Sequence, residues 1–263
     1  MLGNTLVLTL RVLGGLMSSE SIRQLLLQNP PVPLPVNTIA HGSTLVVAPH
    51  PDDESLGCGG AIALLQSLYA VQVLVISDGT LSHPRSRRYP APALQALREQ
   101  ETLCAVAELG VKPEAVIFLR LKDGSVPLPG AVGFEAAVSR CCAYLAAFTP
   151  ATIIMPWRRD PHPDHRASWG LISMAIARLN LSPRLLEYPI WDWDPTQQSE
   201  TPLDSVTAWR LDISKVLPQK LQAIAAHRSQ TTDLIDDDPE GFRLTPEMLA
   251  NFTHPWELYL EAC

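Results

Sequence analysis

The sequence predicts an α/β protein: a three-layer sandwich in which helices cover both faces of a mostly parallel sheet. Short apolar segments rich in β-branched residues alternate with longer helix-like segments, which is typical of repeated β-α-β units. The apolar segments run almost without polar interruption, as expected for strands that are buried on both faces. With 263 residues, 46% of them hydrophobic, the chain can bury the core of one large domain.

The predicted elements follow from this alternation. The predicted strands are residues 44–48, 71–77, 115–119, 152–155, 184–188 and 206–211. The predicted helices are residues 56–69, 92–109, 134–148, 167–179, 215–227 and 246–251.

Residues 1–42 are predicted to form an extension that packs on a main domain of residues 43–263. Residues 1 to about 27 have the pattern of one or two amphipathic helices, and the proline-rich connector from Asn29 to Val36 cannot be helical. A helix on a membrane surface is the alternative, but only Arg11 and Arg23 are basic there. No segment reaches the ~18 apolar residues of a membrane span, so we expect no stable membrane insertion.

Charge and cysteine content narrow the class of partner and the compartment. The 20 Lys and Arg against 27 Asp and Glu give a net charge of −7, which argues against nonspecific binding of nucleic acid. The five cysteines form no CxxC pair and no even disulfide framework, which favours a reducing, cytoplasmic location. The sequence leaves open whether the chain forms a homo-oligomer.

The first chemical motif follows the predicted strand 44–48. His50, Asp52, Asp53 and Glu54 stand in the turn after it, before a Gly-rich helix start. Ionisable groups at the end of a buried strand are costly unless they do chemistry, and ligands bind at the carboxyl ends of strands in open α/β sheets. One imidazole and two adjacent carboxylates indicate part of a metal site with a spare acid-base group.

A second motif, from Trp157 to Arg166, follows the predicted strand 152–155 and contains two further histidines. Neighbouring strands lie ~5 Å apart, so a histidine from this motif could share a metal with His50 and Asp53. Two histidines and one carboxylate leave positions for water and substrate, as in catalytic zinc sites. Asp53 and Asp164 could instead only cap helices, but both fall inside histidine clusters, which favours the metal site.

These residues resemble the signatures of a known family, the PIG-L/LmbE-like N-acetylglucosaminyl deacetylases. The segment Ala48-Pro-His-Pro-Asp-Asp-Glu54 is similar to the family's A-H-P-D-D-E, with Pro49 inserted before the histidine, and His162-Pro-Asp-His165 matches its H-P-D-H. Weaker matches are Arg98 with Glu101, Asp123-Gly124, and His227 to Gln230. The resemblance covers about residues 43 to 232.

The resemblance implies a Rossmann-like fold and a metal-dependent hydrolase, with Zn²⁺ or another divalent cation. Its substrate would be a small acetamido sugar or sugar conjugate of the N-acetylglucosamine type, whose amide is attacked by a metal-activated water. By match to the motifs, the metal ligands would be His50, Asp53 and His165. Asp52 would be the general base, and His162 with Asp164 would form the acid or charge-stabilising pair.

Physical chemistry gives these side chains plausible tasks. Asp52 is next to a ligand but free to carry the proton from the water to the leaving amine. We expect His162 to hydrogen-bond the Asp164 carboxylate through one ring nitrogen and to face the oxyanion as an imidazolium with the other. Glu54 is expected behind the ligands, orienting one of them or the backbone.

Two further residues each allow a functional and a structural interpretation. Arg98 could bind the substrate or only pair with Glu101 on the helix surface. His227 could line the far side of the pocket or only sit at a helix C-terminus.

Two other functions compete with the deacetylase, namely a metal-dependent phosphoesterase and a non-catalytic carbohydrate-binding protein.

Several other features also allow a purely structural interpretation. Trp157, Tyr188, Trp191 and Trp193 could stack on a sugar or fill the core. Gly57, Gly59 and Gly60 do not form GxGxxG, and we expect them to let a helix pack close to the sheet. Cys58 is expected in the core and residues 236–238 in a solvated loop.

Overall fold

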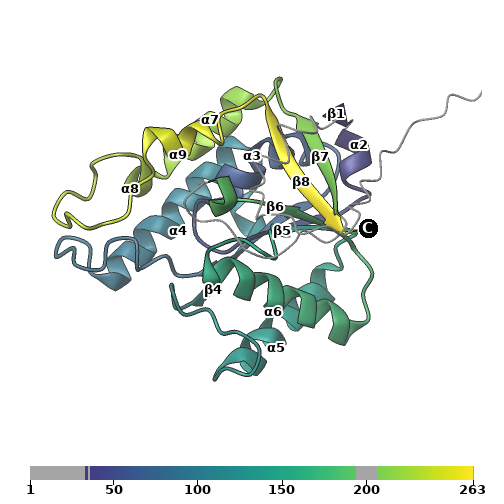
Figure 1. The fold of residues 1–263 in the computed structure, drawn as a ribbon, viewed down its shortest axis with the longest axis horizontal. Coiled ribbons are helices and arrows are strands. Elements are labelled where there is room, and N and C mark those ends of the chain that lie inside the picture. The colour runs from purple at the N-terminus through teal and green to yellow at the C-terminus, as the bar shows by residue number, and fades with distance from the viewer. Residues whose placement is uncertain (1–32, 35, 194–205, 263) are drawn as a thin grey trace, which may run out of the picture.

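The computed structural model describes residues 33–34, 36–193 and 206–262. Within them, one eight-stranded sheet has the order β1-β7-β8-β6-β5-β2-β3-β4 (Figure 1). Neighbouring strands are parallel except where β8 pairs with β6 and β7, to which it is antiparallel. The predicted fold class, an α/β sandwich with a mostly parallel sheet, is confirmed.

The elements have the following bounds. The strands are β1 Pro33–Leu34, β2 Thr44–Ala48, β3 Val71–Ser77, β4 Val116–Leu121, β5 Thr152–Pro156, β6 Arg184–Tyr188, β7 Val206–Asp212 and β8 Trp256–Ala262. The helices are α2 Val36–Ile39, α3 Asp53–Leu65, α4 Ala91–Glu108, α5 Phe134–Phe148, α6 Pro163–Leu179, α7 Leu217–Ala226, α8 Arg228–Thr231 and α9 Pro246–Ala250. Two short 3₁₀ helices are η1 Pro113–Ala115 and η2 Trp191–Trp193.

The sequence predicts the six strands β2 to β7 but neither the two-residue β1 nor β8. Glu257 interrupts the apolar pattern of β8, and the structure buries it beside Lys220, whose Nζ donates to its Oε1 at 2.7 Å. Helices α3 and α6 begin at Asp53 and Pro163, three or four residues earlier than expected. The two chemical motifs therefore reach into the first turns of these helices. The helices predicted in residues 1–27 lie outside the described residues.

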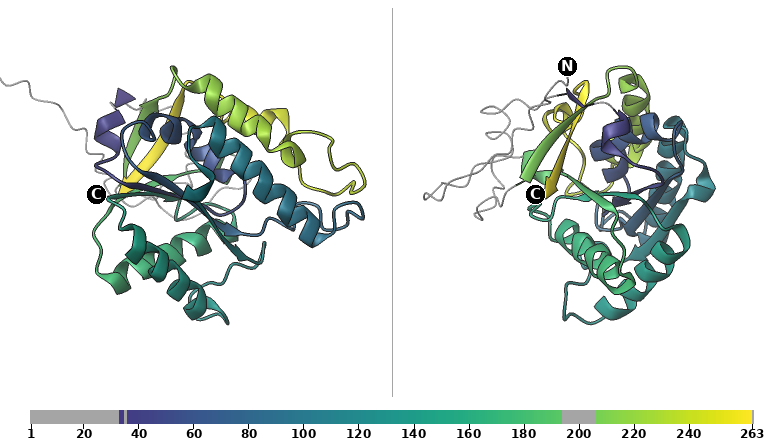
Figure 2. Two further views of the ribbon diagram at one scale, coloured as in Figure 1. Left: turned by 180° about the vertical axis from the view of Figure 1, so that it is seen from behind. Right: turned by 90° about the vertical axis from the view of Figure 1, so that its right-hand side faces the viewer.

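The period-two alternation of β2 separates two hydrophobic layers. Val46 and Ala48 belong to the cluster that contains residues of α3, α4 and α7. Leu45 and Val47 face the other cluster, which contains residues of α5 and α6. Figure 2 shows these two groups of helices on opposite faces of the sheet. Both faces of the central strands are thus covered, which explains their continuous apolar sequence.

Two glycines bring α3 close to its neighbours, as predicted. A Cβ on Gly57 would lie 2.2 Å from Cδ2 of Tyr188, and one on Gly60 would lie 2.4 Å from Cγ2 of Ile213. Cys58 is buried in the core, also as predicted. In the part of the chain described, no helix has both the length and the apolar character required to cross a membrane.

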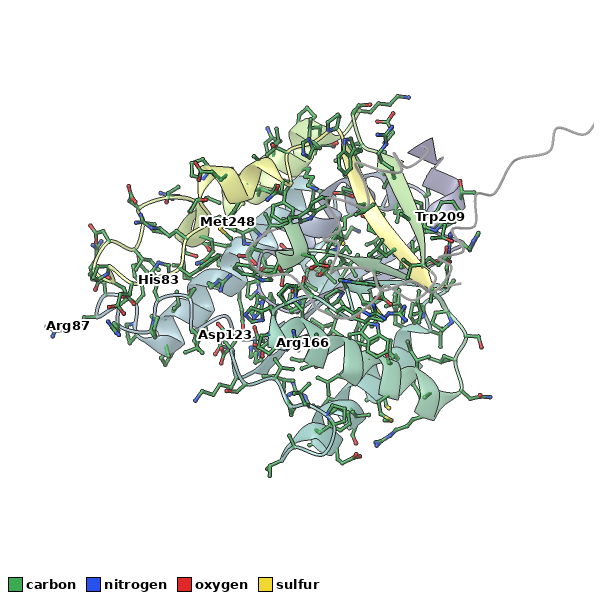
Figure 3. All side chains as sticks on the ribbon, in the orientation of Figure 1. His83, Arg87, Asp123, Arg166, Trp209 and Met248 are labelled. Atoms are coloured by element: carbon green, nitrogen blue, oxygen red, sulfur yellow. The ribbon has the colours of Figure 1, made fainter. Side chains whose placement is uncertain are left out.

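The chain reverses its winding beside β2. It runs from β2 to β3 and β4 on one side, then returns to β5 on the other side. The connections after β2 and β5 lead to α3 and α6, which lie on opposite faces of the sheet. This arrangement opens a crevice at the carboxyl ends of β2 and β5, which is where ligands bind in doubly wound sheets. Figure 3 labels two residues of this region: Asp123, after β4, and Arg166, in the first turn of α6.

Candidate metal centre

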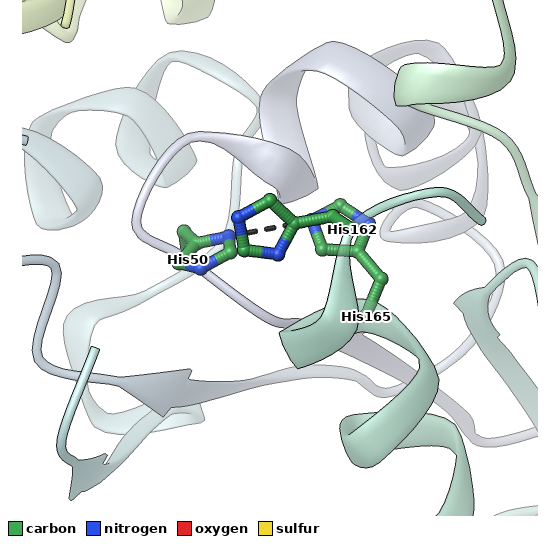
Figure 4. A group of neighbouring side chains, drawn as sticks. All are labelled: His50, His162 and His165. Carbon is green, nitrogen blue, oxygen red and sulfur yellow. Dashed lines mark hydrogen bonds between the residues drawn. The ribbon is translucent and has the colours of Figure 1, made fainter. Parts of the chain in front are cut away.

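Three ligand atoms form a nearly equilateral triangle at this crevice. Oδ2 of Asp53 lies 3.2 Å from Nδ1 of His50 and 3.3 Å from Nε2 of His165, and the two nitrogens are 3.3 Å apart. His50 comes from the turn after β2, Asp53 from the first residue of α3 and His165 from the first turn of α6. Figure 4 shows the His50 and His165 rings with this contact dashed, and His162 beside them.

The triangle has the size of one face of a tetrahedral zinc site. Ligand atoms at 2.0–2.1 Å from a tetrahedral zinc are separated by about 3.3–3.4 Å. His50 and Asp53 also line a cavity of about 360 Å³, so a fourth position faces open space. The three predicted ligands are therefore brought together in an arrangement that fits a zinc ion or a similar divalent cation. Two other groups also bring possible ligand atoms within 4.8 Å of one another, namely His50 with His162 and His165, and His50 with Asp123 and Asp164.

The charges around the triangle favour a cation. Burial alone lowers the pKa of His165, but the carboxylates of Asp160 and Asp53 raise it to about 9. Burial raises the pKa of Asp53, but the His165 and His50 imidazoles bring it well below its usual range. The site thus holds carboxylates ionised and attracts positive charge, either protons on the imidazoles or a metal ion.

Two carboxylates hold the other side of the His50 ring. Its Nε2 lies 3.3 Å from Oδ1 of Asp123 and 3.4 Å from Oδ2 of Asp164. The Asp164 carboxylate also accepts from the backbone N–H groups of Gly124 (2.7 Å) and Val126 (3.2 Å). These contacts fix the ring so that Nδ1 faces the triangle, as carboxylates commonly do for metal-binding histidines. Asp123 had no predicted role, and only its Asp-Gly match pointed to it.

The expected hydrogen bond between the His162 ring and the Asp164 carboxylate is replaced by another. His162 is the N-cap residue of α6, and its Nδ1 accepts from the backbone N–H of Asp164 at 3.2 Å. Burial and the nearby imidazoles of His50 and His165 lower the pKa of His162 to about 4, so the ring is neutral rather than the expected imidazolium. Because Nδ1 is the acceptor, the proton is on Nε2, and the ring lines the cavity.

Asp52 lies beside the triangle in a strained backbone conformation. Its φ is 138°, which non-glycine residues rarely adopt, and its backbone N–H donates to Oε2 of Glu54 at 3.0 Å. Nη2 of Arg98 donates to its Oδ2 at 3.0 Å. Burial raises the pKa of Asp52 to about 7, against the lowering effect of Arg98.

Arg98 and Glu101 do not form the pair considered from the sequence. Arg98 is buried and also donates to the carbonyls of Pro51 (2.5 Å) and Gly79 (3.0 Å). Glu101 instead accepts from the backbone N–H and the hydroxyl of Ser229. The prediction of an ion pair between Arg98 and Glu101 on the helix surface is wrong, because this face of α4 packs against the site.

Glu54 lies behind the triangle and contacts His227. Its Oε1 is 2.8 Å from Nε2 of His227, and both side chains are buried. Burial lowers the pKa of His227, but the Glu54 carboxylate raises it above its usual value. His227 therefore supports Glu54 and, through it, the backbone of Asp52.

Asp160 is a buried residue of the site that the sequence analysis missed. Its carboxylate accepts from the backbone N–H groups of His162, Ile190 and Trp191, and its Oδ1 lies 3.5 Å from Nδ1 of His165. An aspartate before a proline in a loop is common, so only its place in the histidine cluster could have indicated it. Of the aromatic residues considered, Trp191 and Trp193 line the cavity, whereas Trp157 and Tyr188 are in the core.

The crevice at the switch point of this doubly wound α/β sheet thus carries two histidines and one aspartate that could hold a metal ion. The chain belongs to the PIG-L family, GlcNAc-PI de-N-acetylase, whose sequence model matches residues 45–176. That match spans both histidine motifs.

Individual proteins to which the chain is similar are also named as deacetylases. A Bacillus cereus protein named "Probable N-acetyl-alpha-D-glucosaminyl L-malate deacetylase 2" is 28% identical over 201 residues, 73% of this chain and 86% of its own. The 2'-N-acetylparomamine deacetylase of Streptomyces fradiae is 29% identical over 213 residues, 74% of this chain and 76% of its own. The solved N,N'-diacetylchitobiose deacetylase of Pyrococcus horikoshii has a TM-score of 0.55 and 26% identity, covering 81% of this chain and 78% of that one.

Proposed function

We propose that this chain is a metal-dependent hydrolase, with zinc as the best fit, that removes the acetyl group from an N-acetylated amino sugar or sugar conjugate. The observation that carries the proposal is the triangle of His50, Asp53 and His165, with edges of 3.2–3.3 Å, in a chain of the de-N-acetylase family. The relatives' names add deacetylases of glucosaminyl malate and of paromamine, both of which are amino-sugar conjugates.

A divalent cation held by these three residues would supply Lewis acidity, which polarises the amide carbonyl and makes water nucleophilic near neutral pH. Asp52 is placed to take a proton from the attacking water and to return it to the leaving amine. Burial raises the pKa of Asp52, which makes the carboxylate a better acceptor of the proton from water.

The neutral His162 has a different task. Its Nε2–H can donate to the oxygen on which negative charge develops during attack on the amide. Asp164 would hold the His50 ring in the orientation of a metal ligand. This role replaces the predicted pairing of Asp164 with His162. Arg98 and Glu54 would keep Asp52 in position.

The test is hydrolysis of N-acetylglucosamine and its conjugates by protein loaded with Zn²⁺. We expect equimolar release of acetate and free amine, its loss on chelation and its return when metal is restored. The proposal would be wrong if protein shown to carry metal released neither acetate nor free amine from any acetamido sugar.

The two competing functions are tested in the same preparation. A phosphoesterase would release phosphate from a panel of phosphate esters, and a carbohydrate-binding protein would bind an acetamido sugar without turnover. We expect neither result. A cytoplasmic location and the packing of residues 1–42 on the catalytic domain remain predictions from the sequence, which leaves a homo-oligomer open.

A further inference from the structure

The cavity beside the candidate metal centre has two chemically different sets of lining residues. One set, which we term the catalytic end, comprises His50, Asp52, Asp53 and Arg98. The other set is what we term the apolar wall, made of Trp191, Phe242, Leu244, Met248 and Phe252. Figure 3 labels two of the lining residues, Met248 on α9 and Asp123 after β4.

Hydrogen bonds fix the apolar wall next to the centre. The backbone N–H of Phe242 donates to the carbonyl of Ser82 at 2.6 Å, and that of Leu244 donates to the carbonyl of Gln230 at 2.8 Å. Nearby, the Asp238 carboxylate accepts from the backbone N–H of Arg85 at 2.8 Å. The Asp237 carboxylate accepts from the backbone N–H groups of Arg87 and Arg88, so the residues 236–238, expected from the sequence to be solvated, tie this segment to the loop after β3.

Ring contacts connect the apolar wall to the catalytic end. The Phe242 and Trp191 ring centroids are 5.6 Å apart, and the Trp191 ring is stacked on that of His162 with centroids 5.8 Å apart. A substrate whose amide reaches His162 therefore has its neighbouring groups against Trp191 and the rest of the wall.

Most of the apolar wall offers a sugar hydroxyl nothing to bind. The side chains of Phe242, Leu244 and Met248 have no strong hydrogen-bonding group, so a hydroxyl pressed against them would lose water without gaining a partner. The polar side chains that line the cavity away from the catalytic end are Ser82, Gln230 and Asn251. Of these, Gln230 has a buried Oε1 with no hydrogen-bond partner among the described residues, which suits one substrate donor. An alkyl or aryl group would gain from burial against the wall.

We propose that the preferred substrate carries an apolar group, an alkyl or aryl substituent that lies against the wall of Trp191, Phe242, Leu244, Met248 and Phe252 while the amide lies at the metal centre. This inference rests on the proposed amide hydrolysis. The apolar group has two chemical sources: the acyl chain of the amide, or the aglycone attached to the sugar.

Two matched pairs of substrates separate these sources. The first pair is N-acetylglucosamine and N-hexanoylglucosamine, and the second is the methyl and hexyl glycosides of N-acetylglucosamine. Release of the free amine is measured for all four with Zn²⁺-loaded protein. We expect kcat/KM to rise at least tenfold with the longer chain in one of the pairs, since burying two methylene groups already corresponds to about that factor. The pair that responds identifies the source.

A substitution in the apolar wall tests the assignment to residues. Met248→Gln places an amide in the wall and should reduce the preference for the longer chain about tenfold. The matched control is Met174→Gln, at a partly exposed methionine of α6 that does not line the cavity, and it should leave the preference unchanged. An unchanged preference in Met248→Gln would overturn the assignment of the wall.

Failure of this inference is distinguishable from failure of the proposed function. If the short substrates are hydrolysed but neither longer chain improves kcat/KM, the apolar subsite is wrong and the deacetylase stands. If no amide is hydrolysed, the deacetylase is wrong, and binding decides the subsite through the tryptophan fluorescence of the metal-loaded protein. Hexyl glycoside binding at least tenfold more tightly than methyl glycoside would then support the wall, and equal binding would overturn it.

Discussion

Nη2 of Arg98 lies 3.0 Å from Oδ2 of Asp52, and both side chains are buried. The same guanidinium donates to the carbonyls of Pro51 and Gly79, on the turns after β2 and β3. Arg98 thereby joins α4 to both turns and holds the strained backbone of Asp52 in place. The candidate base is positioned by a residue almost fifty positions away in the sequence.

Asp52→Asn is expected to keep the fold and the metal but to lower turnover by about 10²–10⁴-fold. The amide accepts the hydrogen bond from Arg98 but cannot take a proton from water. Metal content by elemental analysis and initial rates of amine release check this. Undiminished turnover in the variant would exclude Asp52 as the base.

Arg98→Met should lower kcat on the order of 10²-fold while KM changes little, because Asp52 loses its correct orientation. A substrate-binding role for Arg98 would instead raise KM. Arg120→Met is the matched control, since Arg120 forms an exposed pair with Glu99 on the surface, and its kinetics should match the unmodified protein. Circular dichroism verifies that both variants are folded, and a change confined to KM would contradict the positioning role.

Gly57→Ala should destabilise the protein by about 1–3 kcal/mol, because the new Cβ would overlap the ring of Tyr188. Gly170→Ala on α6 is the matched control. Its new Cβ would meet Cδ of Pro129 at 3.9 Å, an ordinary contact, so the higher helix propensity of alanine should stabilise it by about 0.5–1 kcal/mol. Urea unfolding of both variants measures the difference. Equal stabilities would show that α3 can move away from β6.

Asp192→Asn should raise the Tm at pH 8 by a few degrees and leave it nearly unchanged at pH 4. Burial raises the pKa of Asp192 to about 7, with the nearby Asp160 adding to it, so the folded state favours the protonated carboxyl. Its destabilising effect is absent below the unfolded pKa of 3.8 and grows as the pH rises from there to about 7. Asp212→Asn, at an exposed carboxylate whose pKa is lowered by the Ser214 backbone, should show no such gain. Equal gains at both pH values would contradict the assigned titration.

Much of the fold was predictable because β2 to β6 obey one rule, namely apolar strands alternating with helices. Strand β8 broke that rule, since Glu257 is held inside it by Lys220, a residue of α7, and by the backbone N–H groups of Gly60 and Ala61 in α3. A partner so distant in sequence leaves no local signal.

The candidate ligands were predictable for a related reason. His50, Asp53 and His165 lie close to two strand ends that the predicted topology already made neighbours. Asp123 and Asp160 were missed, because their importance comes from tertiary contacts with His50 and His165. The orientation of His162 was predicted wrongly, since its Nδ1 caps α6, and that helix begins four residues earlier than the pattern suggested.

The central claim, that His50, Asp53 and His165 hold one divalent cation, is tested most directly by Zn²⁺ titration calorimetry on the apo protein. We expect one tightly bound ion per chain, and strongly weakened binding in His50→Ala, Asp53→Ala and His165→Ala. The control His254→Ala, at a histidine stacked on Trp256, should bind as the unmodified chain does. Unchanged stoichiometry and affinity in the three ligand variants would contradict the account.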